Sequence, residues 1–306
     1  MNGISGVREW EPRPQSETVA PEIAGQPWRR AGWWKMLLGK LALRFSHYHT
    51  PRERLFLKHV SIHGVDLIVP SNEDVGRLIS YLGSYEPDET DFLIPSIRPE
   101  DVCVDVGANI GYYTMLMARA ASAGTVHAFE PDPLCNALLH LNISINEFAN
   151  VRLNPILLGA ASGSMQFLRA SDSGFSSLRD TGRRPIARTY RVKMDTLDEY
   201  LDMLGKGGVD ILKIDVEGAE GLVLEGARRL LDDPHRRPRL ILLELFEPNQ
   251  RPFGSKVSEV VSRLGSSGYS PFVVCSGMRM PYTAAHENIF SNVFFEASMP
   301  AERTMT

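Results

Sequence analysis

The sequence predicts an α/β protein with a mostly parallel, doubly wound sheet of seven strands, one of them antiparallel, and helices on both faces. Short apolar runs typical of strands buried on both faces alternate with segments whose apolar residues recur at helical spacing. That alternation predicts parallel strands joined by helices. Two strand-like runs near the end, 270–274 and 289–295, follow each other without a helical segment and indicate an antiparallel hairpin that closes the sheet.

The individual elements follow in order along the chain. Residues 55–60 and 65–69 indicate short extended segments, and residues 73–97 indicate one or two helices that cover the entrance of the domain. The strands expected in the core are 102–106, 125–129, 151–158, 211–214 and 240–245. The helices expected between them are 111–121, 134–145, 196–204, 217–231 and 256–265. Residues 162–191 are polar and predict a hairpin with a long loop, of which 171–191 is interpreted as a mobile lid.

Length and composition limit the kind of protein. A chain of 306 residues that is 43% hydrophobic and 23% charged predicts one large globular domain at 99–298, preceded by an extension or cap at 31–98. Residues 1–30 are rich in Pro, Glu, Arg and Gly and predict a disordered arm. The formal net charge of −4 argues against a nucleic-acid partner. Three cysteines without metal-site or disulfide spacing favour a reducing, cytoplasmic location.

The chain has no apolar run of the ~20 residues that a transmembrane helix needs. Residues 33–45, however, combine tryptophan, leucine and phenylalanine with Lys35, Lys40 and Arg44. Basic residues beside an apolar face suit a helix that lies on an anionic membrane surface. A helix packed on the domain, or on a second copy of the chain, is the plainer interpretation of the same pattern.

The strongest chemical signal is the turn that follows the 102–106 strand. Asp105, Gly107 and Gly111 stand where a buried strand passes into a helix, and ligands of open parallel sheets bind beyond such strand ends. The glycine spacing of a dinucleotide-binding turn is not met, because Ile110 stands where its last glycine belongs. A carboxylate also repels a pyrophosphate and attracts the sulfonium and ammonium of S-adenosyl-L-methionine. The turn therefore favours S-adenosyl-L-methionine over NAD.

A second acidic residue ends the next strand. Glu130 lies some twenty residues beyond the glycine turn and is followed by Pro131 and Asp132. An acid at this place accepts hydrogen bonds from ribose hydroxyls. Pro131 and Asp132 are also typical of a helix start. Both interpretations hold together if Glu130 binds the ribose and Asp132 begins the helix.

A third motif follows the 211–214 strand. Asp215 stands at the carboxyl end of this strand, and Glu244 stands at the end of the next one, so the two are expected side by side in the same crevice. Glu217 and Glu220 are alternatively explained as acids in the first turn of a helix. Lys213 appears only as a polar break in an apolar run.

These motifs together closely resemble the FkbM family of methyltransferases. The resemblance covers roughly residues 80–295, and it is carried by the strings VDVGANIGYYT, AFEPDP, GFSSL, TLDEYL and LKIDVEGAE. It implies a Rossmann-like methyltransferase fold, S-adenosyl-L-methionine as the methyl donor, and a hydroxyl acceptor on a secondary metabolite, sugar or lipid-linked glycan. It also implies a cofactor site made by Asp105, Gly107, Asn109, Gly111 and Glu130, and it includes Asp215 and Glu217 in the second signature. The first 80 residues lie outside the resemblance, and we expect them to influence the choice of acceptor.

An aliphatic hydroxyl needs a base or a metal ion to help remove its proton. Asp215 is the first candidate for the residue nearest the acceptor. Asp215 and Glu244 could instead bind a hard cation such as Mg²⁺ together, and His286 is a third candidate for the base. Two other functions remain open from the sequence. One is a catalytically silent or membrane-associated S-adenosyl-L-methionine-binding protein, and the other is an NAD-dependent oxidoreductase, against which the glycine spacing argues.

Overall fold

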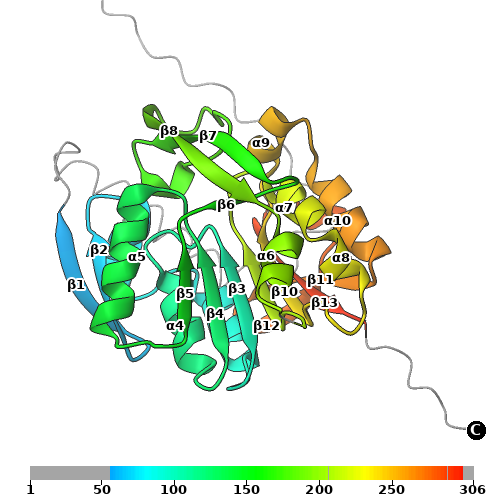
Figure 1. Cartoon of the computed structure of the whole chain (residues 1–306), viewed down its shortest axis with the longest axis horizontal. Helices are drawn as coiled ribbons and strands as arrows, with labels where there is room; N and C mark the ends of the chain where they lie inside the picture. Colours follow the sequence, from blue (N-terminus) through cyan, green and yellow to red (C-terminus); the bar gives the residue numbers. More distant parts are fainter. Residues whose placement is uncertain (1–55, 206, 288, 299–306) are drawn as a thin grey trace, which may run out of the picture.

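The computed structural model describes residues 56–205, 207–287 and 289–298 (Figure 1). The arm expected at 1–30 and the apolar segment at 33–45 lie outside the described residues. Within those ranges no helix is both long and apolar enough to cross a membrane.

The large sheet has the predicted, mainly parallel arrangement. Its strand order is β12-β11-β13-β10-β9-β3-β4-β5, and the pairs between β10, β9, β3, β4 and β5 are all parallel. β13 runs antiparallel to both of its neighbours, β10 and β11. The bounds are β3 Val102–Val106, β4 Thr125–Phe129, β5 Val151–Asn154, β9 Ile211–Ile214, β10 Leu240–Glu244, β11 Tyr269–Cys275, β12 Met278–Pro281 and β13 Asn292–Ala297.

This sheet has eight strands among the described residues, one more than the sequence predicts. The additional strand is β12, which pairs antiparallel with β11 at the edge. Its side chains are largely exposed, so it lacks the apolar run by which buried strands are detected. The antiparallel end of the sheet is therefore a three-strand unit of β11, β12 and β13.

Helices cover both faces of the sheet and produce two separate apolar cores. The first core lies beneath α4 (Tyr112–Ala120) and α5 (Pro133–Ile145) and includes Cys103, Val126 and Ile211 from the sheet. The second contains Val104, Leu212 and other strand residues that point the opposite way. It is covered by α6 Leu197–Met203, α7 Glu220–Gly226, α8 Arg228–Asp232 and α10 Val257–Ser266.

The segment before the core forms a hairpin and two short helices, as predicted. β1 (Leu57–Ile62) and β2 (Val65–Pro70) pair antiparallel beside α5 (Figure 1). Asn142 on α5 and Asn146, the C-cap residue of α5, bond to backbone atoms of β2 and hold it there. α2 (Asp74–Leu82), α3 (Pro87–Leu93) and the short turn η2 (Ile94–Ser96) then lead into β3.

A small second sheet contains the polar excursion. Its order is β6-β8-β7, with bounds Leu157–Leu158, Ile186–Asp195 and Gly163–Ala170, and the turn η3 (Ser173–Phe175) lies between β7 and β8. The single strand expected at 151–158 is wrong. Pro155 ends β5 at Asn154, because proline has no backbone N–H for a sheet ladder, and Leu157 and Leu158 pair with β8 instead.

The helix expected at 217–231 also differs from the structure. Glu217 and Gly218 have φ of +55° and +106°, outside helical geometry, so α7 begins only at Glu220. A break at Ala227 then separates α7 from α8. The short helix α9 (Glu247–Gln250) and the turns η4 (Arg251–Phe253) and η5 (Ala284–His286) carry too little periodicity to be predicted.

Candidate active site

A cavity opens at the carboxyl ends of β3, β4, β9 and β10. Here the chain order reverses, because β4 lies on one side of β3 and β9 on the other, and this is the usual place for a ligand in an open sheet. The small sheet and η3 form the opposite wall and lie at the top of Figure 1. Residues that line the cavity include Val75, Tyr85, Asp105, Gly107, Asn109, Glu130, Pro131, Ser173, Lys213, Asp215, Glu217 and Glu244.

The turn after β3 approaches β9 so closely that only glycine fits. Gly107 has φ +79°, and a Cβ there would lie 1.8 Å from the backbone oxygen of Asp215. The amides of Gly107 and Ala108 both donate to the carbonyl of Phe129, at 3.0 Å. The turn is thus bonded to the end of β4, and its backbone faces the cavity.

Glu130 connects this turn to the start of α5. Its Oε2 accepts from the amide of Asn109 at 2.8 Å, and its Oε1 accepts from the amide of Asp132 at 2.7 Å. Asn109 has φ +50°, so this bond supports a backbone conformation that is uncommon outside glycine. Asp132 caps α5 by accepting from the amides of Leu134 and Cys135, as its sequence position suggests. Burial raises the pKa of Glu130 to about 8, although the two backbone donors oppose that shift.

Asp105 is fully buried beneath the turn. Thr114 Oγ1 donates to its Oδ2 at 2.6 Å, whereas its Oδ1 has no hydrogen-bond partner among the described residues. Lys213 Nζ lies 3.8 Å from that Oδ1. Burial raises the pKa of Asp105, and Lys213 acts against this rise. From the sequence, the cofactor was the only cation expected beside the Asp105 carboxylate. In the structure the Lys213 ammonium is a permanent cation next to it.

Lys213 is the site residue that the sequence analysis missed. It lies directly opposite Asp105 in the register of β9 and β3, and its Nζ donates to Asp215 Oδ2 at 3.1 Å. Its ammonium also lies 5.0 Å from the ring centroid of Tyr113. Burial lowers its pKa, but the attraction of Asp215, Asp105 and Glu86 outweighs burial and raises the pKa above its ordinary value. A charged residue within a buried strand was the available signal, because such a residue needs a partner.

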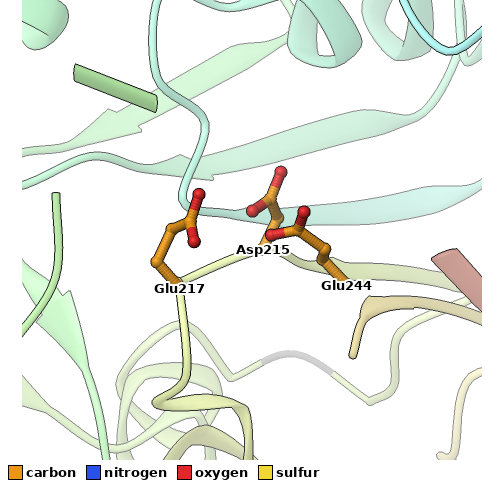
Figure 2. A group of neighbouring side chains, drawn as sticks. All are labelled: Asp215, Glu217 and Glu244. Carbon is orange, nitrogen blue, oxygen red and sulfur yellow. The ribbon is translucent and has the colours of Figure 1, made fainter. Parts of the chain in front are cut away.

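Asp215, Glu217 and Glu244 form a carboxylate cluster at the same edge (Figure 2). One oxygen of each lies within 4.8 Å of the others, which confirms that Asp215 and Glu244 are neighbours. Glu217 accepts from Arg183 Nη1 at 2.7 Å and from the side-chain Nδ2 of Asn249. Burial raises the pKa of Glu217 to about 8. Burial, together with repulsion from Glu217 and Asp215, raises the pKa of Glu244 well above its ordinary value.

The remaining acidic and histidine candidates occupy different places. Glu220 is fully buried at the start of α7 and accepts from the amides of Val216 and Gly218, so a structural role accounts for it. His286 is not among the residues that line the cavity, and its Nδ1 accepts from the Thr283 amide in η5. Glu86, which the sequence analysis did not name, lies near Lys213 and Asp215 and accepts from Tyr113 and Asn292.

Comparison with known proteins decides what kind of site this is. The profile of the family described as Methyltransferase FkbM domain matches residues 105–271, more than half of the chain. The chain belongs to the FkbM methyltransferase family. Membership of this family assigns residues 105–271 to a methyltransferase domain and does not support the alternative of an NAD-dependent oxidoreductase.

Several named relatives are similar to this FkbM-family chain. Methyltransferase 1 of Beauveria bassiana is 32% identical over 157 residues, which cover 45% of this chain and 61% of that protein. The 31-O-demethyl-FK506 methyltransferase FkbM of Streptomyces tacrolimicus is 29% identical over 204 residues, covering 57% and 74%. The hexuronic acid methyltransferase AglP of Haloferax volcanii is 27% identical over 195 residues, covering 62% and 74%. The match thus spans less than two thirds of the first of these relatives.

Among solved structures, the methyltransferase FkbM of Methylobacillus flagellatus is similar at a TM-score of 0.46. It is 12% identical in sequence, and the superposition covers 89% of this chain and 63% of that one.

Proposed function

We propose that this methyltransferase transfers the methyl group to a hydroxyl oxygen of a secondary metabolite, a sugar or a glycan. One observation carries the proposal. The carboxylates of Asp215 and Glu244 open into the same cavity as the glycine turn, so groups able to accept a proton lie beside the place for the methyl donor. A hydroxyl needs such help, because it is a weak nucleophile until its proton is removed.

In this proposal the cofactor lies along the turn after β3. Glycine at 107 lets the turn pass against the backbone of Asp215, and the Oδ1 of Asp105 is a buried acceptor with no hydrogen bond among the described residues. Each oxygen of Glu130 holds one backbone donor and keeps a lone pair for a ribose hydroxyl. Asn109 and Pro131 also line the cavity, whereas Gly111, which the sequence placed in the site, does not line it and packs against Leu139. S-adenosyl-L-methionine supplies the electrophilic methyl group when bound.

The acceptor side of the cavity is proposed to lie toward the segment before the core. Val75 and Tyr85 from this segment line the cavity, which supports a cap role for the described part, residues 56–98, of the extension expected at 31–98 beside the methyltransferase domain at 99–298. Two of the relatives carry names that specify an acceptor, 31-O-demethyl-FK506 in one case and a hexuronic acid in the other. Acceptors of these kinds support a hydroxyl-bearing small molecule or glycan here.

Charge balance favours a carboxylate base over a metal ion. Asp215 accepts from the Lys213 ammonium at 3.1 Å, and Glu217 accepts from Arg183 at 2.7 Å. Two of the three carboxylates that could bind Mg²⁺ therefore already have a cation. The raised pKa of Glu244 means that this residue holds a proton more readily than an ordinary glutamate. We propose that Asp215 orients the hydroxyl and that Asp215 and Glu244 share its proton.

The test is Asp215→Asn, with turnover, S-adenosylhomocysteine affinity and melting temperature measured on the same preparation. Asparagine keeps the size but removes the charge, so we expect near-normal cofactor affinity and turnover lower by about 10²-fold or more, the usual scale for a proton-transfer residue. Asp202→Asn is the control, because Asp202 on α6 forms an exposed ion pair with Arg229 on α8. Normal turnover in Asp215→Asn would assign Asp215 a structural role.

Two further measurements complete the test. Turnover that EDTA abolishes and Mg²⁺ restores would show that the carboxylate cluster binds a metal ion rather than sharing the proton. Incubation with labelled S-adenosyl-L-methionine and a panel of polyketide, sugar and hexuronic acid acceptors tests the substrate class. Cofactor binding without transfer to any acceptor of the panel would favour a catalytically silent protein. The three cysteines are buried thiols, and we propose that the protein acts in the cytoplasm.

A further inference from the structure

Lys213 is surrounded by more negative charge than a structural ion pair requires. Its ammonium lies 3.1 Å from Asp215 and 3.8 Å from Asp105, and Glu86 adds further attraction. The side chain is only 5% exposed. Of the described residues that line the cavity, Lys213 is the only one with a permanent positive charge, and the others include five carboxylates.

The methyl donor brings a second cation into this same cavity. Its sulfonium is positively charged before transfer and becomes a neutral thioether afterwards, while the rest of the cofactor keeps its charge. Lys213 and the sulfonium are therefore alternative partners for the carboxylates of Asp105 and Asp215. A cation already in place weakens the attraction of these carboxylates for the sulfonium, and has little effect on the thioether.

We infer that Lys213 is a resident counter-ion that sets the preference of the site between S-adenosylmethionine and S-adenosylhomocysteine. By balancing Asp105 and Asp215, it prevents the charged donor from being bound too tightly. Binding that holds the ground state more strongly than the transition state slows the chemical step. Positive charge is lost from sulfur during transfer, so a nearby ammonium destabilises the bound donor relative to the transition state. The inference depends on the cofactor and not on the proposed acceptor.

Calorimetry without acceptor tests this role directly. We compare the dissociation constants of S-adenosylmethionine and S-adenosylhomocysteine for the wild type, Lys213→Met and Lys213→Arg over about pH 7 to 9, because removal of Lys213 also removes the attraction that opposes the raised pKa of the buried Asp105. The two ligands differ by one charge at sulfur, so the ratio of their dissociation constants reports the electrostatic potential at that point. We expect Lys213→Met to shift the ratio toward S-adenosylmethionine by about tenfold or more, the effect of one unit charge in a partly buried site. Lys213→Arg should restore a ratio close to that of the wild type.

The chain offers a matched control on β8. Lys193 Nζ pairs with Asp195 Oδ2 at 3.3 Å, two residues along a strand like Lys213 and Asp215, but neither residue lines the cavity. Lys193→Met should leave the ratio of the two dissociation constants unchanged. A shift of the same size in Lys193→Met would mean that the effect does not come from the cavity, and would overturn the inference.

A second comparison covers the case in which Lys213→Met does not fold. Asp215→Asn and the double variant Asp215→Asn/Lys213→Met differ only in Lys213. Compared with Lys213→Met alone, the double variant has one buried carboxylate fewer that lacks a partner, because Asp215 is also replaced. The inference expects the double variant to prefer S-adenosylmethionine more strongly than Asp215→Asn does. An equal ratio in both would show that Lys213 is only structural. Because no acceptor is present, these results stand whether or not the proposed hydroxyl transfer is found.

Discussion

Replacing Glu130 with alanine is expected to weaken cofactor binding while the fold persists. In our proposal the Glu130 carboxylate has a structural role, which the hydrogen bonds show, and a cofactor-binding role. It bonds the amides of Asn109 and Asp132, at 2.8 and 2.7 Å, and in our proposal it also accepts from the ribose hydroxyls. Alanine removes both sets of bonds at once, and Asn109 loses the contact that supports its left-handed backbone.

The size of the effect follows from the bonds that are lost. A hydrogen bond to a charged group contributes about 1.5–3 kcal/mol, which corresponds to roughly 10- to 150-fold in affinity. Burial raises the pKa of Glu130 to about 8, so most of the population is protonated near neutral pH, and we expect the lower half of this range there. Glu130→Gln keeps one acceptor oxygen and should lose less affinity than Glu130→Ala.

Calorimetric titration with S-adenosylhomocysteine measures this loss, and thermal melting checks the fold. Asp132→Ala is a suitable control at the same turn, because Asp132 caps α5 and pairs with Arg169 but does not line the cavity. Removing a cap costs about 0.5–2 kcal/mol of stability, and removing one partner of a buried ion pair costs about 3–5 kcal/mol, so this variant should melt considerably earlier yet bind almost normally while folded. A folded Glu130→Ala protein with unchanged affinity would remove Glu130 from the cofactor site.

Two other predictions concern Glu217 and its partner. Burial raises the pKa of Glu217 from 4.5 to about 8, so the folded state holds a proton that the unfolded state releases between these values. The apo protein should therefore lose stability as the pH rises from about 5 to about 8. In Glu217→Gln the melting temperature should fall less over this pH range than in the wild type. If both proteins show the same dependence of melting temperature on pH, the raised pKa of Glu217 is contradicted. Arg183 joins the β7–β8 connection to Glu217 and lies 4.3 Å from the Phe175 ring centroid. Arg183→Ala should speed amide hydrogen exchange in residues 171–185 and reduce the protection from exchange that the cofactor adds. If the wild type shows identical exchange with and without cofactor, this segment is not a lid over the cavity.

Much of the fold was predictable because its signals are local. Every residue of β3 and β4 was assigned from short apolar runs, and the adjacency of Asp215 and Glu244 followed from their positions at the ends of consecutive strands. Where the limits were wrong, a single residue explains the difference. Pro155 divided one expected strand, and the positive φ of Glu217 delayed the start of α7.

The sequence by itself determined the fold class, the family and the glycine turn, because strand and helix periodicity and the motif strings are written in neighbouring residues. Only the tertiary structure decided which charges face one another. Lys213 meets Asp105 through the register of β9 on β3, and Arg183 reaches Glu217 from the small sheet. Both contacts join residues far apart in the chain. These contacts depend on strand order and on backbone turns with positive φ. Neither contact produces a periodic pattern in the sequence, so the partner residue cannot be predicted from it.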